Sequence, residues 1–303
     1  EIGTNNFFEI RELTKLVKPS QIFITNILST HLENFKNKNN IAKEKNDFFN
    51  KKYNSNSEIL YFQMNSNEEK TINNISKKQQ LKKIIKIGEF GLDCYIKKIK
   101  ENKKNYKINL KILNKNFSFN LSTYDESQIN NLIFVLAFFV VNKIQTNLIF
   151  RNKIKFPQIN GRGSIHKIII NGVYVKLIDQ SYNANPETMI QSIKNFSKIE
   201  KKGFKKILIL GDMNELGSNK MNFHYNVLKE ANEHLFDNVI LSGDLFKKAL
   251  KMFPNSQSKY IYRSSSKGIM SYLNKNLHKK AMMMIKCSNA TQVNKFVKLL
   301  KQR

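Results

Sequence analysis

Two polar loops, each directly after an apolar run, carry residue types that could bind a substrate. The first is Ser181–Pro186 (SYNANP), whose proline stands where helices often begin. The second is Gly211–Gly217 (GDMNELG). Amide, hydroxyl and carboxylate side chains at the ends of strands suit polar ligands. Periodicity alone favours a plainer explanation of the first loop, a turn that ends in an asparagine helix cap.

Strand-like and helix-like segments alternate from about residue 157 onwards and must position these loops. The expected strands carry KIIIN, YVKLIDQ, ILILGD, NVILSGD, KYIYRSS and AMMMIKCS, and the expected helices begin at Pro186, cover residues 221–232, begin at 245, end at 276 and cover 291–300. This alternation predicts a mainly parallel sheet with helices on both faces. Active sites in such sheets lie at the carboxyl ends of the strands, where both loops fall.

The first half of the chain has a different pattern. A strand is expected at Gln21–Ile27, and helices at about residues 40–52 and 126–143. Between Glu58 and Thr123, short apolar runs alternate with lysine- and asparagine-rich turns, which predicts hairpins in a largely antiparallel sheet. A polar segment near 152–157 ends this pattern, so the predicted domains are 1–154 and 155–303.

The charge is strongly basic, but its distribution argues against a nucleic-acid partner. The 303 residues include 52 Lys and Arg against 23 Asp and Glu, a net charge of +29. The excess is nearly all lysine and is spread along the chain, without an arginine-rich stripe, zinc-ligand spacing or an aromatic RNA-binding signature. We therefore interpret these lysines as a solvated surface whose field favours anionic substrates.

Cysteine usage and hydropathy indicate a protein of the reducing cytoplasm. Cys94 and Cys287 lie far apart in the chain, which predicts neither a disulfide framework nor a thiolate metal site. The longest apolar run, around Leu132–Val141, is too short to span a membrane and is expected to be a buried helix.

The two loops, in this order and spacing, resemble those of the Mur ligase family, and in particular of its members that add D-alanyl-D-alanine. Further matching segments are EIGTNNFFEI at 1–10, ITNILSTHLENF at 24–35, IAKEKNDFF at 41–49, GRG at 161–163 and IKCSNA at 285–290. The resemblance covers essentially the whole chain. It implies an α/β fold in which the remainder of a central ATPase domain precedes a Rossmann-like, doubly wound C-terminal domain.

The resemblance also implies a reaction. Such a ligase joins D-alanyl-D-alanine to UDP-MurNAc-tripeptide through an acyl phosphate, with ATP and Mg²⁺, in the synthesis of peptidoglycan precursors. Charge that builds up on the phosphate oxygens requires the metal and cationic donors. We expect a cytoplasmic monomer with no nucleic-acid partner and no membrane span.

Three residues match metal-site positions of the family. Glu1 corresponds to a Mg²⁺ ligand, His31 to the ligand of a second Mg²⁺, and Lys45 to a carbamoylated lysine whose CO₂ adduct supplies oxygen donors. Without the family, a single loop histidine is more often a surface residue, and one lysine among 52 basic residues carries no information. Lys43 is the neighbouring rival for modification, and we prefer Lys45 from the alignment of the two-lysine stretch.

Other residues match nucleotide, catalytic and dipeptide positions. For the nucleotide these are Asn131 at the adenine, Arg162 at a phosphate, and Tyr182; for catalysis, Asn183 and Asn185; and for the dipeptide, Lys286 and Ser288. Asn130 is an alternative to Asn131, helix capping explains either asparagine as well, and Ser127 stands where the family has a histidine. His224 follows the second loop, close to a histidine position of the family, and a place on a helix surface explains it at least as well.

The chain departs from the family in three ways. It contains no Gly-x-x-Gly-Lys-Thr/Ser phosphate loop, since GTNN at residues 3–6 is not followed by that pattern, and the UDP-binding domain that precedes the loop is also missing. Gln180 replaces an aspartate, and Cys287 replaces a glycine, where a side chain is expected to strain the loop. We therefore expect no ligation by this fragment alone. The alternative is a diverged, non-catalytic module that binds a nucleotide or a partner chain.

Overall fold

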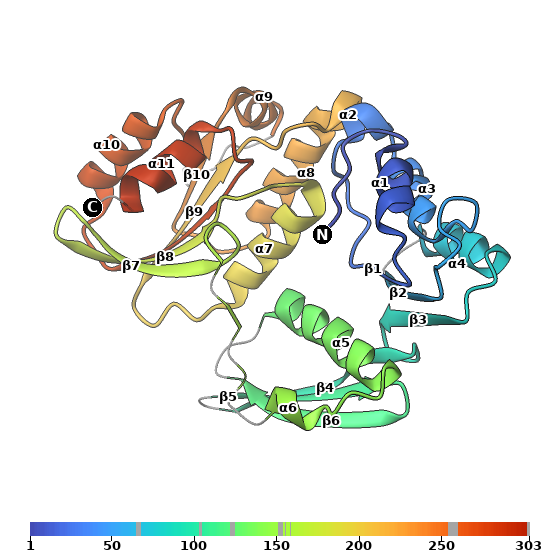
Figure 1. The fold of residues 1–303 in the computed structure, drawn as a ribbon. Coiled ribbons are helices and arrows are strands. Elements are labelled where there is room, and N and C mark those ends of the chain that lie inside the picture. The colour runs from blue at the N-terminus through green and yellow to red at the C-terminus, as the bar shows by residue number, and fades with distance from the viewer. Residues whose placement is uncertain are drawn as a thin grey trace. The chain divides into compact units, whose positions relative to one another are not determined.

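The computed structural model describes residues 1–64, 68–102, 105–121, 125–150, 154, 156–157, 159–253 and 260–301. The chain divides into two compact units (Figure 1). The first comprises Glu1–Ile27 and Asn34–Phe156, and the second Leu28–Glu33 and Pro157–Arg303. The domain boundary expected after Ile154 adjoins residues 151–153, 155 and 158, which lie outside the described residues.

The first unit contains a six-stranded sheet in the order β1-β2-β3-β4-β5-β6. Its strands are β1 (Gln21–Ile24), β2 (Ile59–Met64), β3 (Lys83–Gly88), β4 (Cys94–Asn102), β5 (Asn105–Ile112) and β6 (Lys115–Leu121). The expected antiparallel pairing is correct for β4, β5 and β6 but wrong for β2 and β3, which pair in parallel with their neighbours. A parallel pair needs a crossover, and helix α4 (Glu68–Lys78), which the sequence did not predict, connects β2 to β3.

The first unit also contains several helices. They are α1 (Glu9–Val17), α3 (Lys38–Asn46), the 3₁₀ helix η1 (Asp47–Phe49), α5 (Glu126–Val141) and α6 (Asn147–Phe150), and the short α2 (Leu32–Phe35) spans the division between the units. The apolar face of α5 shares a core with residues of β3, β4 and β5. Asp125 caps α5, because its Oδ1 accepts hydrogen bonds from the backbone N–H groups of Ser127 (2.9 Å) and Gln128 (3.3 Å).

The second unit contains the predicted mainly parallel sheet, in the order β11-β10-β9-β12-β8-β7. Its strands are β7 (Ser164–Ile170), β8 (Val173–Gln180), β9 (Lys205–Gly211), β10 (Asn238–Ser242), β11 (Tyr260–Tyr262) and β12 (Ala281–Lys286). Only the pairing of β7 with β8 is antiparallel in this sheet of described strands. Buried Ile, Leu, Val and Met side chains fill these strands, as expected for a sheet covered on both faces.

Helices cover both faces of this sheet, which confirms the doubly wound fold (Figure 1). The helices are α7 (Pro186–Lys198), the 3₁₀ helix η2 (Gly217–Asn219), α8 (Lys220–Asn232), α9 (Asp244–Met252), α10 (Ser266–Asn276) and α11 (Gln292–Lys301). One apolar core contains residues of α7, α8 and α9, and a second contains residues of α10 and α11.

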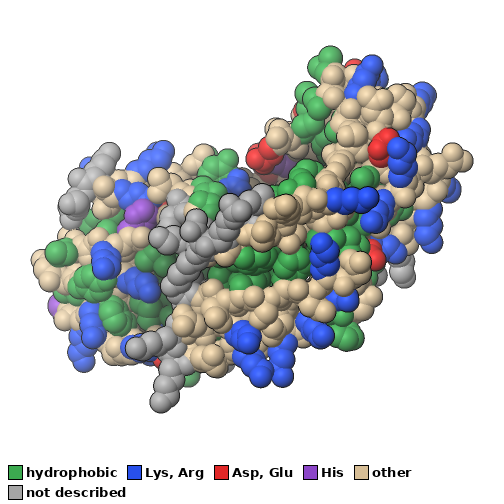
Figure 2. Space-filling model, turned by 60° about the horizontal axis from the view of Figure 1, so that its bottom comes forward, with side chains coloured by type: hydrophobic (Ala, Val, Ile, Leu, Met, Phe, Trp, Pro, Cys, Tyr) green, Lys and Arg blue, Asp and Glu red, His purple; other side chains and the backbone are tan. Residues whose placement is uncertain are grey.

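Surface features agree with the composition. In Figure 2, Lys and Arg side chains lie scattered among other side chains over the face in view, as expected for a solvated surface. Cys94 and Cys287 are buried free thiols. In the described part of the chain, every helix is too short or too polar to cross a bilayer.

Candidate active site at the carboxyl ends of the second sheet

Three neighbouring strands of the second sheet end in polar residues on the same edge. The strands β9, β12 and β8 are adjacent and parallel. SYNANP follows β8, and GDMNELG overlaps the end of β9. Lys286 ends the strand β12 between them, and Ser288 lies two residues further on. The register aligns Lys286 with both Gln180 and Leu210, so the two predicted loops flank the end of β12.

Lys286 and Ser288 each hold one of these loops. Lys286 Nζ donates a hydrogen bond to the carbonyl oxygen of Asn183 (3.2 Å), and Ser288 Oγ accepts one from the backbone N–H of Asn214 (3.1 Å). Lys286 is 6% exposed, and burial lowers its pKa to about 8. The edge of the sheet therefore holds a buried amine bonded to the carbonyl of the exposed Asn183, where it can balance the charge of an anionic ligand.

Asn185 caps helix α7. Its side-chain oxygen accepts the backbone N–H of Thr188 (2.9 Å), and the Thr188 hydroxyl oxygen accepts the backbone N–H of Asn185 (3.3 Å), which completes a capping box. Pro186 then occupies the first turn. The helix cap that periodicity favoured for this loop is therefore present at Asn185. Asn183, two residues earlier, is exposed.

Replacement of Asn185 separates capping from catalysis. We expect Asn185→Ala to lower the free energy of unfolding by about 1 kcal/mol, because it removes the cap acceptor. Asn185→Asp keeps an acceptor oxygen and is expected to keep stability within a few tenths of a kcal/mol. Urea denaturation measures both, and equal losses in the two variants would contradict the capping role.

Arg162 and Tyr182, the residues predicted for nucleotide binding, lie together. The guanidinium carbon of Arg162 is 4.4 Å from the centre of the Tyr182 ring. Both side chains are exposed, with Tyr182 at 52%. The backbone N–H of Tyr182 donates to the carbonyl of Gly161 (3.1 Å), and Gly161 has a φ of +76°. A Cβ at Gly161 would lie 2.9 Å from the Cβ of Tyr182, so this close approach requires glycine.

His224 is buried, so the alternative of a place on the helix surface is wrong. It is 0% exposed, its Nε2 accepts the backbone N–H of Met213 (3.0 Å), and its Nδ1 lies 2.7 Å from the carbonyl of Lys220. Because an N–H only donates and a carbonyl only accepts, the proton is on Nδ1 and the ring is neutral. His224 therefore fixes the GDMNELG loop. The signal in the sequence that could have predicted its burial is its helical spacing from Val227 and Leu228, which are also buried.

The buried imidazole predicts a pH dependence of stability. Burial lowers the pKa of His224 from 6.5, and the unfolded chain then binds the proton more readily than the folded one. The contribution of His224 to the free energy of unfolding is therefore fully present above about pH 6.5. As the pH drops below that value, the free energy of unfolding falls by up to about 1.4 kcal/mol per pH unit. We expect His224→Gln to flatten this slope, measured by urea denaturation at pH 5.5–7.5, and the exposed His278→Gln to preserve it. A slope unchanged in His224→Gln would contradict the assignment.

Asp212 has a structural role that the sequence did not reveal. Its carboxylate accepts the backbone N–H groups of Leu245 (3.0 Å) and Phe246 (2.9 Å), and so caps α9 from another loop. Gly243, just before that helix, has a φ of +112°, and a Cβ there would lie 2.2 Å from the Asp212 carboxyl carbon.

His31 contacts the same GDMNELG loop. Its Nδ1 pairs with a carboxylate oxygen of Glu215, and the backbone N–H of Glu33 donates to the Glu215 carbonyl (3.1 Å). Ser29 also donates its hydroxyl to Glu187 in the first turn of α7 (2.7 Å). These contacts explain why the segment 28–33 belongs to the second unit.

The other predicted residues lie in the first unit. Lys45, in α3, is largely buried, and its Nζ donates to the carbonyl of Asn26 (2.6 Å), whereas Lys43 on the same helix is exposed. Burial lowers the pKa of Lys45. Glu1 is exposed. Across the described ranges, no three His, Cys, Asp or Glu side chains gather as a metal site.

Asn131 is exposed in the second turn of α5. Because Asp125 caps this helix, the capping explanation for Asn130 or Asn131 is wrong. The exposed amide of Asn131 remains available in the predicted nucleotide-binding role.

Local contacts accommodate the two substitutions at family positions, Gln180 and Cys287. Gln180 Oε1 accepts the hydroxyl of Ser192 in α7 (2.5 Å). The prediction of backbone strain at Cys287 is wrong, because the φ of this residue is not in the left-handed region. Room for its side chain comes from Gly211, where a Cβ would lie 2.7 Å from the Cβ of Cys287.

Two family profiles match most of the chain. The Mur ligase middle domain matches residues 1–139, and the domain described as "Mur ligase, glutamate ligase domain" matches residues 162–289. The chain belongs to the Mur ligase family.

Its relatives include UDP-N-acetylmuramoyl-tripeptide–D-alanyl-D-alanine ligases. The one from Buchnera aphidicola subsp. Acyrthosiphon pisum is 28% identical over 98% of this chain and 63% of the relative, and the one from Rickettsia prowazekii is 24% identical over 98% and 64%. The chain therefore spans less than two thirds of the length of these curated relatives.

Solved structures share the fold. MurF from Acinetobacter baumannii has a TM-score of 0.81 at 19% identity, covering 100% of this chain and 64% of that one. MurF from Thermotoga maritima in complex with ADP has a TM-score of 0.76 at 20% identity, covering 98% and 65%.

Proposed function

We propose that the protein to which this chain belongs is an ATP-dependent ligase that joins D-alanyl-D-alanine to UDP-MurNAc-tripeptide through an acyl phosphate. The observation that carries this proposal is the meeting of SYNANP and GDMNELG on either side of β12, where Lys286 and Ser288 hold one loop each. Relatives with this activity match 98% of the chain. The proposed setting is the cytoplasmic synthesis of peptidoglycan precursors.

The residues suit a nucleotide. ATP supplies the phosphoryl group when bound, and the Arg162 guanidinium is a fork-shaped donor for a phosphate. The Tyr182 ring beneath it fixes the direction of that cation at an exposed edge of the sheet. Asn183 is exposed beside Tyr182, and Asn131 presents its amide from α5. We propose that Arg162, Tyr182 and Asn183 bind and orient the nucleotide and the reacting carboxylate. For Asn131 we propose a contact with the adenine.

The donor types also suit Mg²⁺, which prefers oxygen ligands and keeps several waters. Glu1 offers a carboxylate, and His31 an imidazole whose Nδ1 pairs with Glu215. The lowered pKa of Lys45 increases the neutral amine, which is the form that reacts with CO₂ to give a carbamate. Mg²⁺ would supply charge neutralisation at the phosphates. We propose Glu1 as a ligand of one Mg²⁺ and His31 as a ligand of a second, and we propose that carbamoylated Lys45 supplies oxygen donors.

In the dipeptide step, an amine must attack the activated carbonyl. Lys286 provides a buried positive charge close to the loop that carries Asn183, and we propose that it and Ser288 orient the incoming dipeptide. Both residues also hold loops in this conformation, so dipeptide binding and loop position are coupled.

Phosphate release by the complete gene product tests this function. We expect release that requires ATP, Mg²⁺, UDP-MurNAc-tripeptide and D-alanyl-D-alanine together. Omission of each component in turn is the control. Release that is independent of the dipeptide would contradict the proposed ligation, and nucleotide binding without any release would favour a non-catalytic module.

A further inference from the structure

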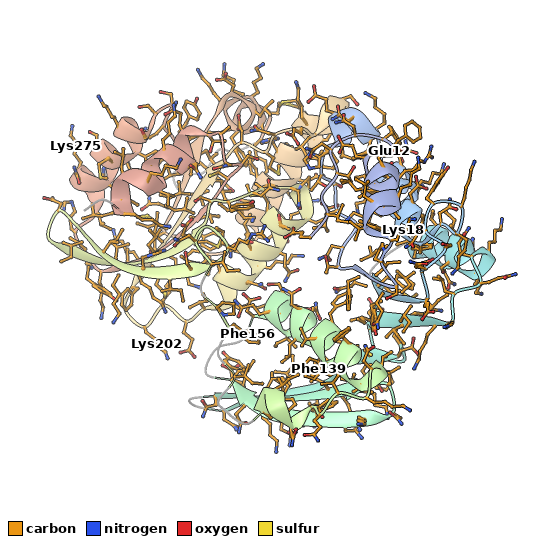
Figure 3. All side chains as sticks on the ribbon, viewed as in Figure 1. Glu12, Lys18, Phe139, Phe156, Lys202 and Lys275 are labelled. Atoms are coloured by element: carbon orange, nitrogen blue, oxygen red, sulfur yellow. The ribbon has the colours of Figure 1, made fainter. Side chains whose placement is uncertain are left out.

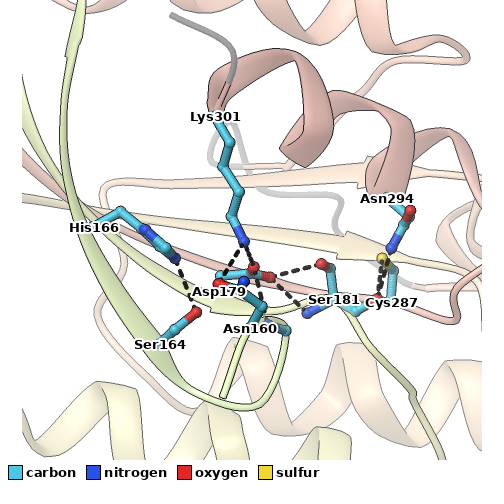
Figure 4. Close-up of polar contacts among 9 residues, drawn as sticks. Asn160, Ser164, His166, Asp179, Ser181, Cys287, Asn294 and Lys301 are labelled. Atoms are coloured by element: carbon cyan, nitrogen blue, oxygen red, sulfur yellow. Dashed lines mark hydrogen bonds and ion pairs between the residues drawn. The ribbon is translucent and has the colours of Figure 1, made fainter. Parts of the chain in front are cut away.

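Asp179, near the end of β8, is a buried carboxylate (1% exposed) on which several segments converge (Figure 4). Its Oδ1 accepts the backbone N–H (2.9 Å) and hydroxyl (2.6 Å) of Ser181, at the start of the SYNANP loop. Its Oδ2 accepts the backbone N–H of Gly161 (3.2 Å), and its carbonyl oxygen accepts that of Gly163 (2.7 Å).

These contacts join the two parts of the proposed nucleotide site. Gly161 and Gly163 flank Arg162, and Ser181 precedes Tyr182. The single residue Asp179 therefore fixes both the turn that carries the guanidinium and the loop that carries the ring beneath it. A loss of order at Asp179 would release both segments together.

A buried carboxylate is costly unless it is paired, and the last helix supplies the partner. Lys301, at the end of α11, places Nζ 2.5 Å from Asp179 Oδ2 and 3.4 Å from Asn160 Oδ1 (Figure 4). Burial alone would raise the pKa of Asp179, but hydrogen bonds from Lys301 and Ser181 outweigh it and hold that pKa below its ordinary value. Asn294 of the same helix donates to the Ser181 carbonyl (2.9 Å).

We propose that Lys301 is a positioning residue for nucleotide binding: by pairing with Asp179, it holds the Arg162 turn and the Tyr182 loop in their stacked arrangement. This inference rests on the proposed function. Lys301 reaches the nucleotide site only through Asp179 and does not act on the reacting atoms.

The ammonium can be removed without loss of the helix. Buried apolar side chains of α11, namely Val293, Phe296, Val297 and Leu300, anchor it in the core. Lys301→Met keeps the aliphatic stem and removes the charge, and Lys301→Arg keeps the charge. Lys298→Met, at an exposed position of the same helix, is the matched control. Figure 3 draws the described side chains as sticks on the ribbon.

Two measurements on the complete gene product test the inference. By hydrogen exchange, we expect Lys301→Met to speed exchange of the amides of residues 161, 163 and 181 about tenfold, which corresponds to about 1.4 kcal/mol of local stability. In the ligase assay, we expect the KM for ATP to rise about tenfold and the KM for D-alanyl-D-alanine to change less than twofold. In Lys301→Arg, the exchange rate and the KM for ATP should lie within threefold of the wild-type values. Lys298→Met should match the wild type in both.

Unchanged exchange in Lys301→Met would overturn the positioning role. Faster exchange with an unchanged KM for ATP would overturn its link to the nucleotide. If the wild type shows no ligation, the proposed function fails, while hydrogen exchange still decides whether Lys301 holds the two segments. An equal rise in the KM for ATP and the KM for D-alanyl-D-alanine would indicate a general structural effect and would also overturn the inference.

Discussion

Lys45→Met is expected to lower the ligation rate of the complete gene product about a thousandfold, the scale seen when a preorganised electrostatic group is removed from a phosphoryl-transfer or acyl-transfer site. The variant removes the amine that we propose to be carbamoylated and keeps an aliphatic side chain in its place. Because Lys45 is largely buried and bonded to the Asn26 carbonyl, urea denaturation must accompany the assay to separate activity from stability.

Lys43→Met distinguishes the two lysines. Lys43 lies on the same helix but is exposed, so its replacement is expected to change the rate less than twofold. A large loss in Lys43→Met with a near-normal rate in Lys45→Met would reverse the assignment. A ¹³C carbamate signal from labelled bicarbonate, present in the wild type and absent in Lys45→Met, is the direct spectroscopic check.

Gly243→Ala is expected to lower the free energy of unfolding by about 3 kcal/mol, the sum of backbone strain and a lost helix cap. The new Cβ would overlap the Asp212 carboxylate, whose carboxyl carbon would be 2.2 Å away. To make room, that carboxylate must leave the backbone N–H groups of Leu245 and Phe246. Urea denaturation measures the loss.

Gly172→Ala is the matched control for the backbone part of this effect. Gly172 also has a positive φ, +76°, but a Cβ there would meet nothing within 4 Å. We expect a loss of about 1 kcal/mol from conformation alone. Equal losses in the two variants would show that the clash with Asp212 contributes nothing.

The second sheet could be predicted from sequence because its signals are local. Runs such as ILIL and AMMMI are wholly buried strands, and each is followed by a helical pattern that supplies the crossover. The first sheet was predicted only in part. The apolar runs of β2 and β3 do not reveal whether the strands pair in parallel or antiparallel. The direction depends on the crossover helix α4, and its polar sequence (EEKTINNISKK) gave no helical signal.

The site could be predicted as two loops but not as a network. SYNANP and GDMNELG were recognisable as continuous segments, and so was the proline that opens α7. The contacts of Asp212 with α9, 33 and 34 residues away, and of Lys301 with Asp179, 122 residues away, exist only after folding. Lys301 was one basic residue among 52, with no local pattern to mark it.

Isotope transfer from the tripeptide substrate tests the ligation most directly. The complete gene product is incubated with ATP, Mg²⁺, D-alanyl-D-alanine and UDP-MurNAc-tripeptide labelled with ¹⁸O in its terminal carboxylate. An acyl-phosphate mechanism predicts that mass spectrometry detects the pentapeptide product together with one ¹⁸O in the released phosphate. Absence of the pentapeptide, or a pentapeptide formed with unlabelled phosphate, would contradict the account.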